Sequence, residues 1–556
     1  MHNNRITMKK LGILLLFLVA SFFAEAQIAT NIYWVQFADK DNSPYSIDMP
    51  EQYLSQRALD RRARLGIGID EYDLPVNPHY LEAVAECGAE LINPSKWLNG
   101  VTIHASDPSV VEAVNALDFV AEVRNCPSFP DAQKDKERWL AMEMKPSAAT
   151  PRNSKGLYGD AWVQVSQIKA NELHSMGFDG TGVYIAVLDG GFIGTEDYDC
   201  FDNMRQEGRF LGEREFVYGA TSVYTQSTHG TSCLSTMAAF LPNEFVGTAP
   251  KASYVLIHTE DGDSENIVEE YNWVSGAEFA DSLGVDVCST SLGYIDFDMT
   301  QWNHPFEHFD GHTAPMTIGA EIAASRGMLC AVAAGNEGSG TCTLGIPADA
   351  EHILTVGAVN ETGTRASFSS MGPTYDGRVK PDVMALGQGT FVASGWGSWW
   401  PYYNGDGTSF ATPVLAGAVA CLRQALPNAS VQDICDAIRQ SGDHAHSPNN
   451  YYGYGIPDFS QALETLHVED TFVQKNDLIL VFPNPSQGEI HVAMKEGYQA
   501  EITVYDILGR RLNDYHFNGL NHTTFESYLN GLSNGVYFIK AESDRGYQVV
   551  KLVMAR

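Results

Sequence analysis

Short apolar runs and helical patterns alternate through the middle of the chain. The apolar runs are typical of strands buried on both faces, and they fall at 183–188, 254–258, 285–290, 328–334 and 353–359. Amphipathic stretches such as 268–282 lie between them and predict helices. Strands that alternate with helices indicate an α/β domain, so we expect a mostly parallel sheet with helices on both faces.

Three motifs place polar side chains at the ends of these elements. Asp189, in V-L-D-G, ends the first apolar run, where the carboxyl edge of a parallel sheet would lie. His229, in H-G-T-S, precedes a run of small residues suited to a buried helix. Ser409, in G-T-S-F-A-T-P, opens a further helix, and Pro413 is expected within its first turn. The three motifs therefore put an acid, a base and a hydroxyl at element termini.

These three residue types together can perform nucleophilic catalysis. A serine hydroxyl is a weak nucleophile until a base takes its proton, and a carboxylate holds the imidazole in the required tautomer. Asn336 follows the apolar run 328–334, in the motif A-G-N. Its amide could donate there to the oxyanion of a tetrahedral intermediate. The pattern predicts a serine hydrolase that acts on peptide bonds.

The ordered motifs D-G-G, H-G-T, S-L-G, A-A-G-N and G-T-S-F-A-T-P resemble the subtilisin-like serine proteases. The resemblance implies that Asp189 orients His229, that His229 is general base and then acid, and that Ser409 attacks. It also implies that Asn336 and the Ser409 backbone N–H form the oxyanion hole. Two extended edges would bind the substrate backbone as an added strand, and they consist of Ser291, Leu292 and Gly293 and of Ala333, Ala334 and Gly335.

Two positions depart from the common pattern of that family. Two functions other than that of a peptidase also remain as alternatives. Gly190-Gly191 replaces Thr-Gly after the aspartate, and Ser232 replaces a second histidine after H-G-T. Taken singly, each motif could be a turn, a helix cap or a structural residue. The rival functions are a catalytically silent surface binding protein on a subtilase scaffold, and a serine esterase.

An acidic run could bind a hard cation. Glu260-Asp261-Gly262-Asp263-Ser264-Glu265, followed by Glu269-Glu270, offers carboxylate oxygens that suit calcium, but it lacks the spacing of a full calcium loop. A solvated loop is the alternative. We expect that the chemistry needs no cofactor, and that a structural calcium ion would bind at a site the sequence does not identify.

Composition narrows the class of protein and of partner. A chain of 556 residues is expected to form two or three domains, and a net charge of −34 without a basic patch argues against nucleic-acid binding. We also expect a monomer, and the resemblance to the subtilases implies polypeptide substrates. Nine cysteines leave at least one unpaired, and buried free thiols are expected at Cys233, Cys288, Cys330 and Cys421.

The N-terminal region has the features of an exported precursor. Residues 1–26 contain a basic segment, an apolar segment and A-E-A, which predicts a signal peptide cleaved before Gln27, with Met8 as an alternative start. No other apolar span is long enough to cross a membrane. Residues 27–125, with a strand at 32–37 and a basic helical stretch around Arg61, are interpreted as an α+β propeptide that assists folding and masks the site. A permanent accessory domain is the alternative.

The remaining boundaries follow from changes in composition. Residues 126–155 are expected to be a linker with a processing site, 156–467 the catalytic domain, and 468–476 a second linker. Short, closely spaced strands from 477 to 556 predict a small antiparallel β-sandwich. F-P-N-P at 482–485, V-Y-D at 504–506 and N-G-V-Y at 534–537 resemble the C-terminal sorting domain of the type IX secretion system of Bacteroidetes.

That resemblance implies export through the periplasm by the type IX secretion machinery, and a final location outside the cell or on its surface. A carbohydrate-binding or adhesive β-domain is the alternative for the tail.

Overall fold

The computed structural model describes residues 31–126, 156–262, 264–394 and 401–466, and parts of the C-terminal region between 479 and 554. The chain forms two compact units, Met1–Ser460 and Gln461–Arg556. The predicted signal peptide (1–26), residues 127–155 of the first linker and the linker 468–476 lie outside the described residues.

A seven-stranded sheet forms the centre of the first unit, and every neighbouring pair of its strands is parallel. In spatial order the strands are β13 (Val383–Leu386), β12 (Leu354–Val359), β11 (Leu329–Ala333), β10 (Val287–Thr290), β5 (Tyr184–Asp189), β9 (Ser253–His258) and β6 (Phe210–Glu215). The predicted parallel sheet is confirmed. The sequence pattern missed both edge strands, because β6 is largely polar and only partly buried and β13 is a buried run of only four residues.

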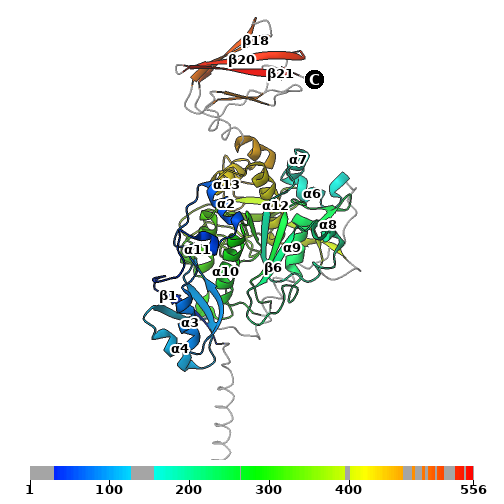
Figure 1. The fold of residues 1–556 in the computed structure, drawn as a ribbon. Helices are drawn as coiled ribbons and strands as arrows, with labels where there is room; N and C mark the ends of the chain where they lie inside the picture. The colour runs from blue at the N-terminus through cyan, green and yellow to red at the C-terminus, as the bar shows by residue number, and fades with distance from the viewer. Residues whose placement is uncertain are drawn as a thin grey trace, which may run out of the picture. The chain divides into compact units, whose positions relative to one another are not determined.

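Helices pack on both sides of this sheet (Figure 1). α10 (Val268–Leu283) and α11 (Pro315–Ser325) pack on one another, and so do α9 (His229–Ala238) and α12 (Thr408–Ala425). The other elements of this region are α6 (Trp162–Gln167), α7 (Ala170–Ser175), α8 (Asp202–Gln206), α13 (Val431–Gln440), β7 (Phe240–Leu241), β8 (Phe245–Val246), β14 (Gln388–Ala393), β15 (Tyr402–Asp406), and the 3₁₀ turns η2 (Gly156–Tyr158), η3 (Asp199–Phe201), η4 (Thr300–Trp302) and η5 (Phe306–His308).

The N-terminal part of the same unit has its own antiparallel sheet, in the order β2-β3-β1-β4. Its elements are β1 (Ile32–Phe37), η1 (Pro50–Gln52), α2 (Gln56–Leu65), α3 (Pro78–Glu86), β2 (Glu90–Ser95), β3 (Gly100–His104), α4 (Pro108–Asn115) and β4 (Val120–Asn125). Val35, Val84, Val101 and Val114 are completely buried in a core that belongs to this part alone. An α+β arrangement, as predicted, is therefore present here.

The second unit contains two antiparallel sheets. One is the pair β16 (Ile479–Phe482) and β17 (His491–Met494); the other has the order β19-β18-β20-β21, from β18 (Gln499–Asp506), β19 (Arg511–Asn518), β20 (Gly535–Ser543) and β21 (Gly546–Met554). Val504, Ile539 and Leu552 are buried. Within the described residues, no helix combines the length and the apolar character needed to span a membrane.

Candidate active site

Asp189 and His229 form a hydrogen-bonded pair at the carboxyl end of the central sheet. Asp189 is the last residue of β5 and is completely buried, and its Oδ1 lies 2.7 Å from Nδ1 of His229. The same oxygen accepts from the backbone N–H of Gly190 at 2.8 Å. Because a carboxylate oxygen accepts, the hydrogen is assigned to Nδ1, and Nε2 is left as the basic nitrogen of the ring.

The loop after Asp189 requires glycine. Gly191 has a φ of +135°, and a Cβ there would lie 2.3 Å from the carbonyl oxygen of Thr225. Its own carbonyl accepts from the N–H of Gly230 at 3.0 Å, which ties the loop to the first turn of α9. Gly191 is therefore the glycine that the common family pattern also has at this position. The departure lies at Gly190, where an added Cβ would be 3.8 Å from Glu260 Cβ, and it leaves the Asp189–His229 contact intact.

Ser409 is the second residue of α12 and is completely buried in this structure. Its hydroxyl points to the carbonyl oxygen of Ser291, 3.4 Å away. The neighbouring ring of Phe410 lies 6.0 Å, centroid to centroid, from the ring of His229. The fold therefore brings the start of α12 beside the start of α9, although 180 residues separate the two motifs in the sequence.

Pro413 lies inside α12, so the expectation that it would occupy the first turn is wrong. Proline has no N–H to donate to the carbonyl four residues earlier, which here is that of Ser409. Two side chains take the place of that donor: the Ser291 hydroxyl donates to the Ser409 carbonyl oxygen at 2.8 Å, and the Cys233 thiol at 3.4 Å. The helix tolerates this proline because tertiary contacts satisfy the carbonyl it leaves unpaired.

The side-chain amide of Asn336 has a defined orientation. Its Oδ1 accepts from both the backbone N–H and the hydroxyl of Thr408, each at 2.9 Å. Because both donors hold the oxygen, the NH₂ group is directed to the other side and stays available as a donor. Thr408 immediately precedes Ser409, so this contact fixes Asn336 relative to the nucleophile. The sequence motif contained Thr408, but nothing in the pattern assigned it a contact.

The two segments expected to bind substrate differ in their hydrogen bonding. The Ala334 N–H donates to the Val356 carbonyl, and the Ala334 carbonyl accepts from the Gly345 N–H. The Gly335 N–H donates to the Thr408 hydroxyl, and the Gly335 carbonyl accepts from the Ser370 N–H. These backbone groups are already paired inside the protein. Ala333 likewise lies in register with Val356 in the sheet.

The segment Ser291, Leu292 and Gly293 follows the carboxyl end of β10. The Ser291 carbonyl faces the Ser409 hydroxyl, as described above, and Leu292 is largely buried. Gly293 lies close to Gly345, because a Cβ on Gly293 would be 3.3 Å from the Gly345 Cα. This segment thus lies directly beside the candidate nucleophile.

Cys233 is a buried neighbour of the pair that sequence analysis did not place in the site. Its sulfur is 3.8 Å from Nε2 and 3.9 Å from Nδ1 of His229. Burial raises the pKa of this thiol to about 12, so it is neutral at ordinary pH. Asp189, His229 and Cys233 are the one group of three potential metal ligands with converging donor atoms in the described part of the chain. All nine cysteines are free thiols, and Cys233, Cys288, Cys330 and Cys421 are buried as expected.

The acidic run makes contacts within the protein where the structure describes it. Asp261 accepts from Gln226 Nε2 at 3.0 Å and from the Ser264 hydroxyl at 2.6 Å. The Glu269 carboxylate accepts from the backbone N–H groups of Asp261 and Asn266, at 2.8 and 2.9 Å. Asp263 lies outside the described residues. The calcium ion stays a prediction.

Comparisons with known proteins match three successive parts of the chain. Residues 180–455 match the subtilase family of peptidases, residues 32–139 match the peptidase S8 propeptide domain of Bacteroidota, and residues 480–555 match a secretion system C-terminal sorting domain. The chain is 35% identical over 301 residues to subtilisin NAT of Bacillus subtilis subsp. natto and to a subtilisin of Bacillus pumilus. These matches cover 52% of this chain, and 68% and 94% of the two relatives.

A serine protease of Bacillus subtilis, AprX, is 29% identical over 323 residues, which cover 53% of this chain and 69% of the relative. The sorting domain indicates secretion to the cell surface or to the outside. Family, fold and the position of the motifs at the carboxyl ends of β5, β10 and β11 agree. The chain therefore belongs to the subtilase family, and it is a subtilisin-like serine endopeptidase that carries a propeptide domain and a secretion sorting domain.

Proposed function

We propose that Asp189, His229 and Ser409 are the catalytic triad of this endopeptidase, and that Asn336 and the Ser409 backbone N–H form its oxyanion hole. The observation that carries this assignment is the 2.7 Å contact between Asp189 Oδ1 and His229 Nδ1 beside the amino terminus of α12. It leaves Nε2 as the proton acceptor. The Ser409 N–H lies in the first turn of the helix, where backbone donors have no partner within the helix.

In the proposed reaction, the Ser409 hydroxyl turns from the Ser291 carbonyl toward His229 and attacks the scissile carbonyl carbon. His229 takes the hydroxyl proton, and Asp189 stabilises the resulting imidazolium. The oxyanion accepts from the Asn336 amide and the Ser409 N–H. His229 then donates its proton to the leaving amine, and a water molecule, deprotonated by His229, hydrolyses the acyl-enzyme. Catalytic hydrogen bonds are often long before substrate binds, which fits the present direction of the hydroxyl.

The substrate is proposed to pair with one edge and lie against another. Ser291, Leu292 and Gly293 lie beside the nucleophile and supply the edge that pairs with the peptide backbone. Ala334 and Gly335 use their backbone groups internally, and Ala333 lies in the sheet in register with Val356. We therefore assign these three residues to a wall of the binding site and not to an added strand. No cofactor takes part in the proposed chemistry. A structural calcium ion would show itself as a higher Tm in calcium than in chelator.

We further propose that the enzyme is exported as a monomeric precursor whose signal peptide is removed before Gln27. The region 126–155 would be cut, so that the domain 27–125 and the catalytic domain 156–467 would become separate chains. The domain 477–556 would direct the protein across the outer membrane by the type IX machinery. Mass spectrometry of the mature N-termini tests this order, because a permanent N-terminal domain would leave only chains that begin near Gln27.

Labelling by a fluorophosphonate probe tests the catalytic assignment. Wild-type enzyme and the Ser325→Ala variant, which lacks a hydroxyl at the end of α11, are expected to label equally. Ser409→Ala is expected to lose both labelling and peptidase activity, because no acyl-enzyme can form. Labelling of Ser409→Ala at the wild-type level would overturn the assignment. A wild-type protein that neither labels nor cleaves would instead be the binding protein considered above.

A further inference from the structure

Helix α2 extends the N-terminal domain beyond its four-stranded sheet. It lies between β1 and α3 in the sequence, and its residues belong to none of the four strands. The helix nonetheless contacts α10 of the catalytic domain. At its start, the Ser55 N–H donates to the Ser282 carbonyl at 3.0 Å. Two of its arginines, Arg61 and Arg62, are 1–2% exposed, which is unusual for charged side chains.

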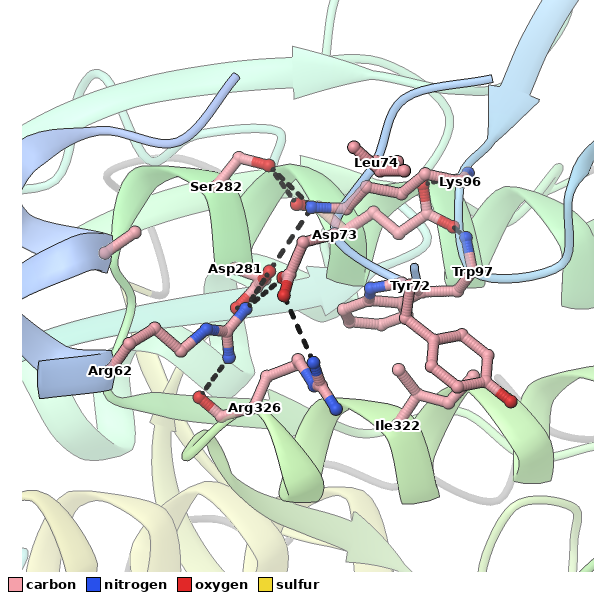
Figure 2. Close-up of polar contacts among 12 residues, drawn as sticks. Arg62, Tyr72, Asp73, Leu74, Lys96, Trp97, Asp281, Ser282, Ile322 and Arg326 are labelled. Carbon is pink, nitrogen blue, oxygen red and sulfur yellow. Dashed lines mark hydrogen bonds and ion pairs between the residues drawn. The ribbon is translucent and has the colours of Figure 1, made fainter. Parts of the chain in front are cut away.

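Three cations of the N-terminal domain surround one carboxylate of the catalytic domain. Asp281, in the last turn of α10, forms an ion pair with Arg61. It also pairs with Arg62 at 3.0 Å and with Lys96 at 3.3 Å (Figure 2). Asp281 is completely buried under them. Burial by itself raises the pKa of this carboxyl, but the three cations outweigh it and the pKa lies below the usual value. The cations that offset the burial of this carboxylate therefore all come from the N-terminal domain.

Beside the ion pairs of Asp281 lies a second set of ion pairs, in which the catalytic domain supplies the cation and the N-terminal domain the anions. Arg326, which follows α11 of the catalytic domain, pairs with Asp73 at 3.2 Å and with Asp70 at 2.8 Å. Asp73 also pairs with Arg62 at 2.7 Å, and Arg62 donates to the Arg326 carbonyl at 2.5 Å (Figure 2). The catalytic domain thus presents an anion and a cation side by side, and the N-terminal domain supplies the complement of each.

A second anion extends the pattern toward the start of β10. Asp286 pairs with Arg57, and with Arg64 at 3.3 Å. The turn between β2 and β3 has separate contacts: Glu278 of α10 accepts from the backbone N–H groups of Lys96 and Trp97, at 2.8 and 3.0 Å. Contacts to backbone N–H groups do not depend on which side chains the partner carries. The ion pairs of Asp281, Arg326 and Asp286, by contrast, depend on the charged side chains that the N-terminal domain carries.

We propose that α2 and the segment 66–77 form a docking element in addition to the turn that contacts Glu278. Through this element, the mature catalytic domain selects and retains the N-terminal domain of this chain after the linker is cut. The N-terminal domain that is retained carries Arg61 and Arg62 opposite Asp281, and Asp73 opposite Arg326. A domain of the same fold without these charges would leave Asp281 buried and unpaired, and would be released. This inference rests on the proposed cleavage between the two domains.

The test compares self-processed full-length enzymes that differ only in the N-terminal domain. In the double variant Arg61→Gln/Arg62→Gln, the mature catalytic domain keeps the wild-type sequence. The Kd of the cleaved fragment, from the recovery of peptidase activity on dilution, is expected to rise on the order of 100-fold or more. Glu82→Gln, which removes a charge from the exposed face of α3, is the control and should match wild type within threefold. An unchanged Kd in the double variant would overturn the proposal.

A second measurement separates this proposal from the proposed processing. If mass spectrometry finds only uncut chains, the processing is wrong, and docking is then measured in the uncut Ser409→Ala precursor. There the double variant is expected to increase amide hydrogen exchange in α2 and in the last turn of α10, with no increase in β1 or β3. Exchange equal to that of the parent precursor would contradict the docking role even if the double variant lowers the yield of folded protein.

Discussion

The Ser291 hydroxyl donates to the Ser409 carbonyl oxygen at 2.8 Å, where Pro413 cannot. A helix would normally satisfy this carbonyl with the N–H of residue 413. In this enzyme Ser291, in the proposed substrate-binding segment, and Cys233, in α9, supply the donors instead. The proline thus links the local structure at the proposed nucleophile to two other elements of the site.

Ser291→Ala should destabilise the enzyme by about 1–3 kcal/mol, since a buried carbonyl loses its better donor. The effect should shrink in a Pro413→Ala background, because the new backbone N–H can bond to the Ser409 carbonyl. Urea unfolding of the four proteins, all in the Ser409→Ala form to prevent self-digestion, gives the coupling energy. Additive losses would mean that the hydroxyl does not stand in for the missing helical bond.

Thr408→Val should lower kcat by about tenfold with little change in KM, because one of the two donors that hold the Asn336 Oδ1 is lost while the backbone N–H remains. Asn336→Ala should cost more, about 10²–10³-fold in kcat, which is the usual loss for one oxyanion donor. Steady-state kinetics on one peptide substrate measures both. Thr412→Val removes a hydroxyl one turn later in α12 and serves as the control. A rise in KM with kcat unchanged would place Thr408 in substrate binding.

Cys233 should resist alkylation at pH 8, although it lies beside His229. With a pKa of about 12, roughly one thiol in 10⁴ is ionised at that pH, and the thiolate is the reactive form. Iodoacetamide should therefore leave peptidase activity unchanged over an hour, and peptide mapping should find Cys233 unmodified. The half-buried Cys87, mapped in the uncut Ser409→Ala chain, reports that the reagent is active. Rapid inactivation with modification of Cys233 would show that the thiol is ionised by its neighbours.

His304 should make stability depend on pH. Burial by itself lowers the pKa of His304, but Glu270, whose Oε1 lies 2.6 Å from Nε2, outweighs burial and the pKa is raised. A raised pKa means that protonation stabilises the fold. This contribution is complete below about pH 6.5, the unfolded value, and is lost as pH rises through the folded pKa. His308 contacts the other ring nitrogen at 3.1 Å, and Asp349 also acts on this histidine.

The measurement is the Tm of the Ser409→Ala chain between pH 5.5 and 8.5. His304→Gln is expected to flatten the fall in Tm above pH 6.5, whereas His444→Gln, which changes an exposed histidine paired with Asp443, should leave it as in the parent. If the parent and the His304→Gln variant lose Tm in parallel, the Glu270–His304 pair does not contribute to the pH dependence.

Truncation after residue 467 should preserve specific activity on peptides, because the compact unit Gln461–Arg556 supplies none of the proposed catalytic residues. In a host with type IX secretion, the truncated enzyme should accumulate in the periplasm. Activity assays on purified protein and fractionation of the host measure the two effects. Normal appearance in the medium, or a loss confined to large polymeric substrates, would make the tail a binding module.

The sequence alone determined the order of the motifs and the elements that carry them. Apolar runs close to β5, β9, β10, β11 and β12 predicted the parallel sheet, and Asp189 and Asn336 were placed at its carboxyl edge. These features depend on residues near one another in the chain, whose periodicity reflects burial on one or both faces. The polar edge strand β6 carried no such signal, and the sequence pattern missed it.

Only the tertiary structure decided how the site is held and how the N-terminal domain docks. The orientation of the Asn336 amide depends on Thr408, 72 residues away, and the tolerance of Pro413 depends on Ser291, 122 residues before it. Arg61 and Arg62 predicted only a basic helix, while their pairing with Asp281 spans about 220 residues. Such contacts leave no local pattern in the sequence, because the fold and not the spacing brings a donor to a buried acceptor.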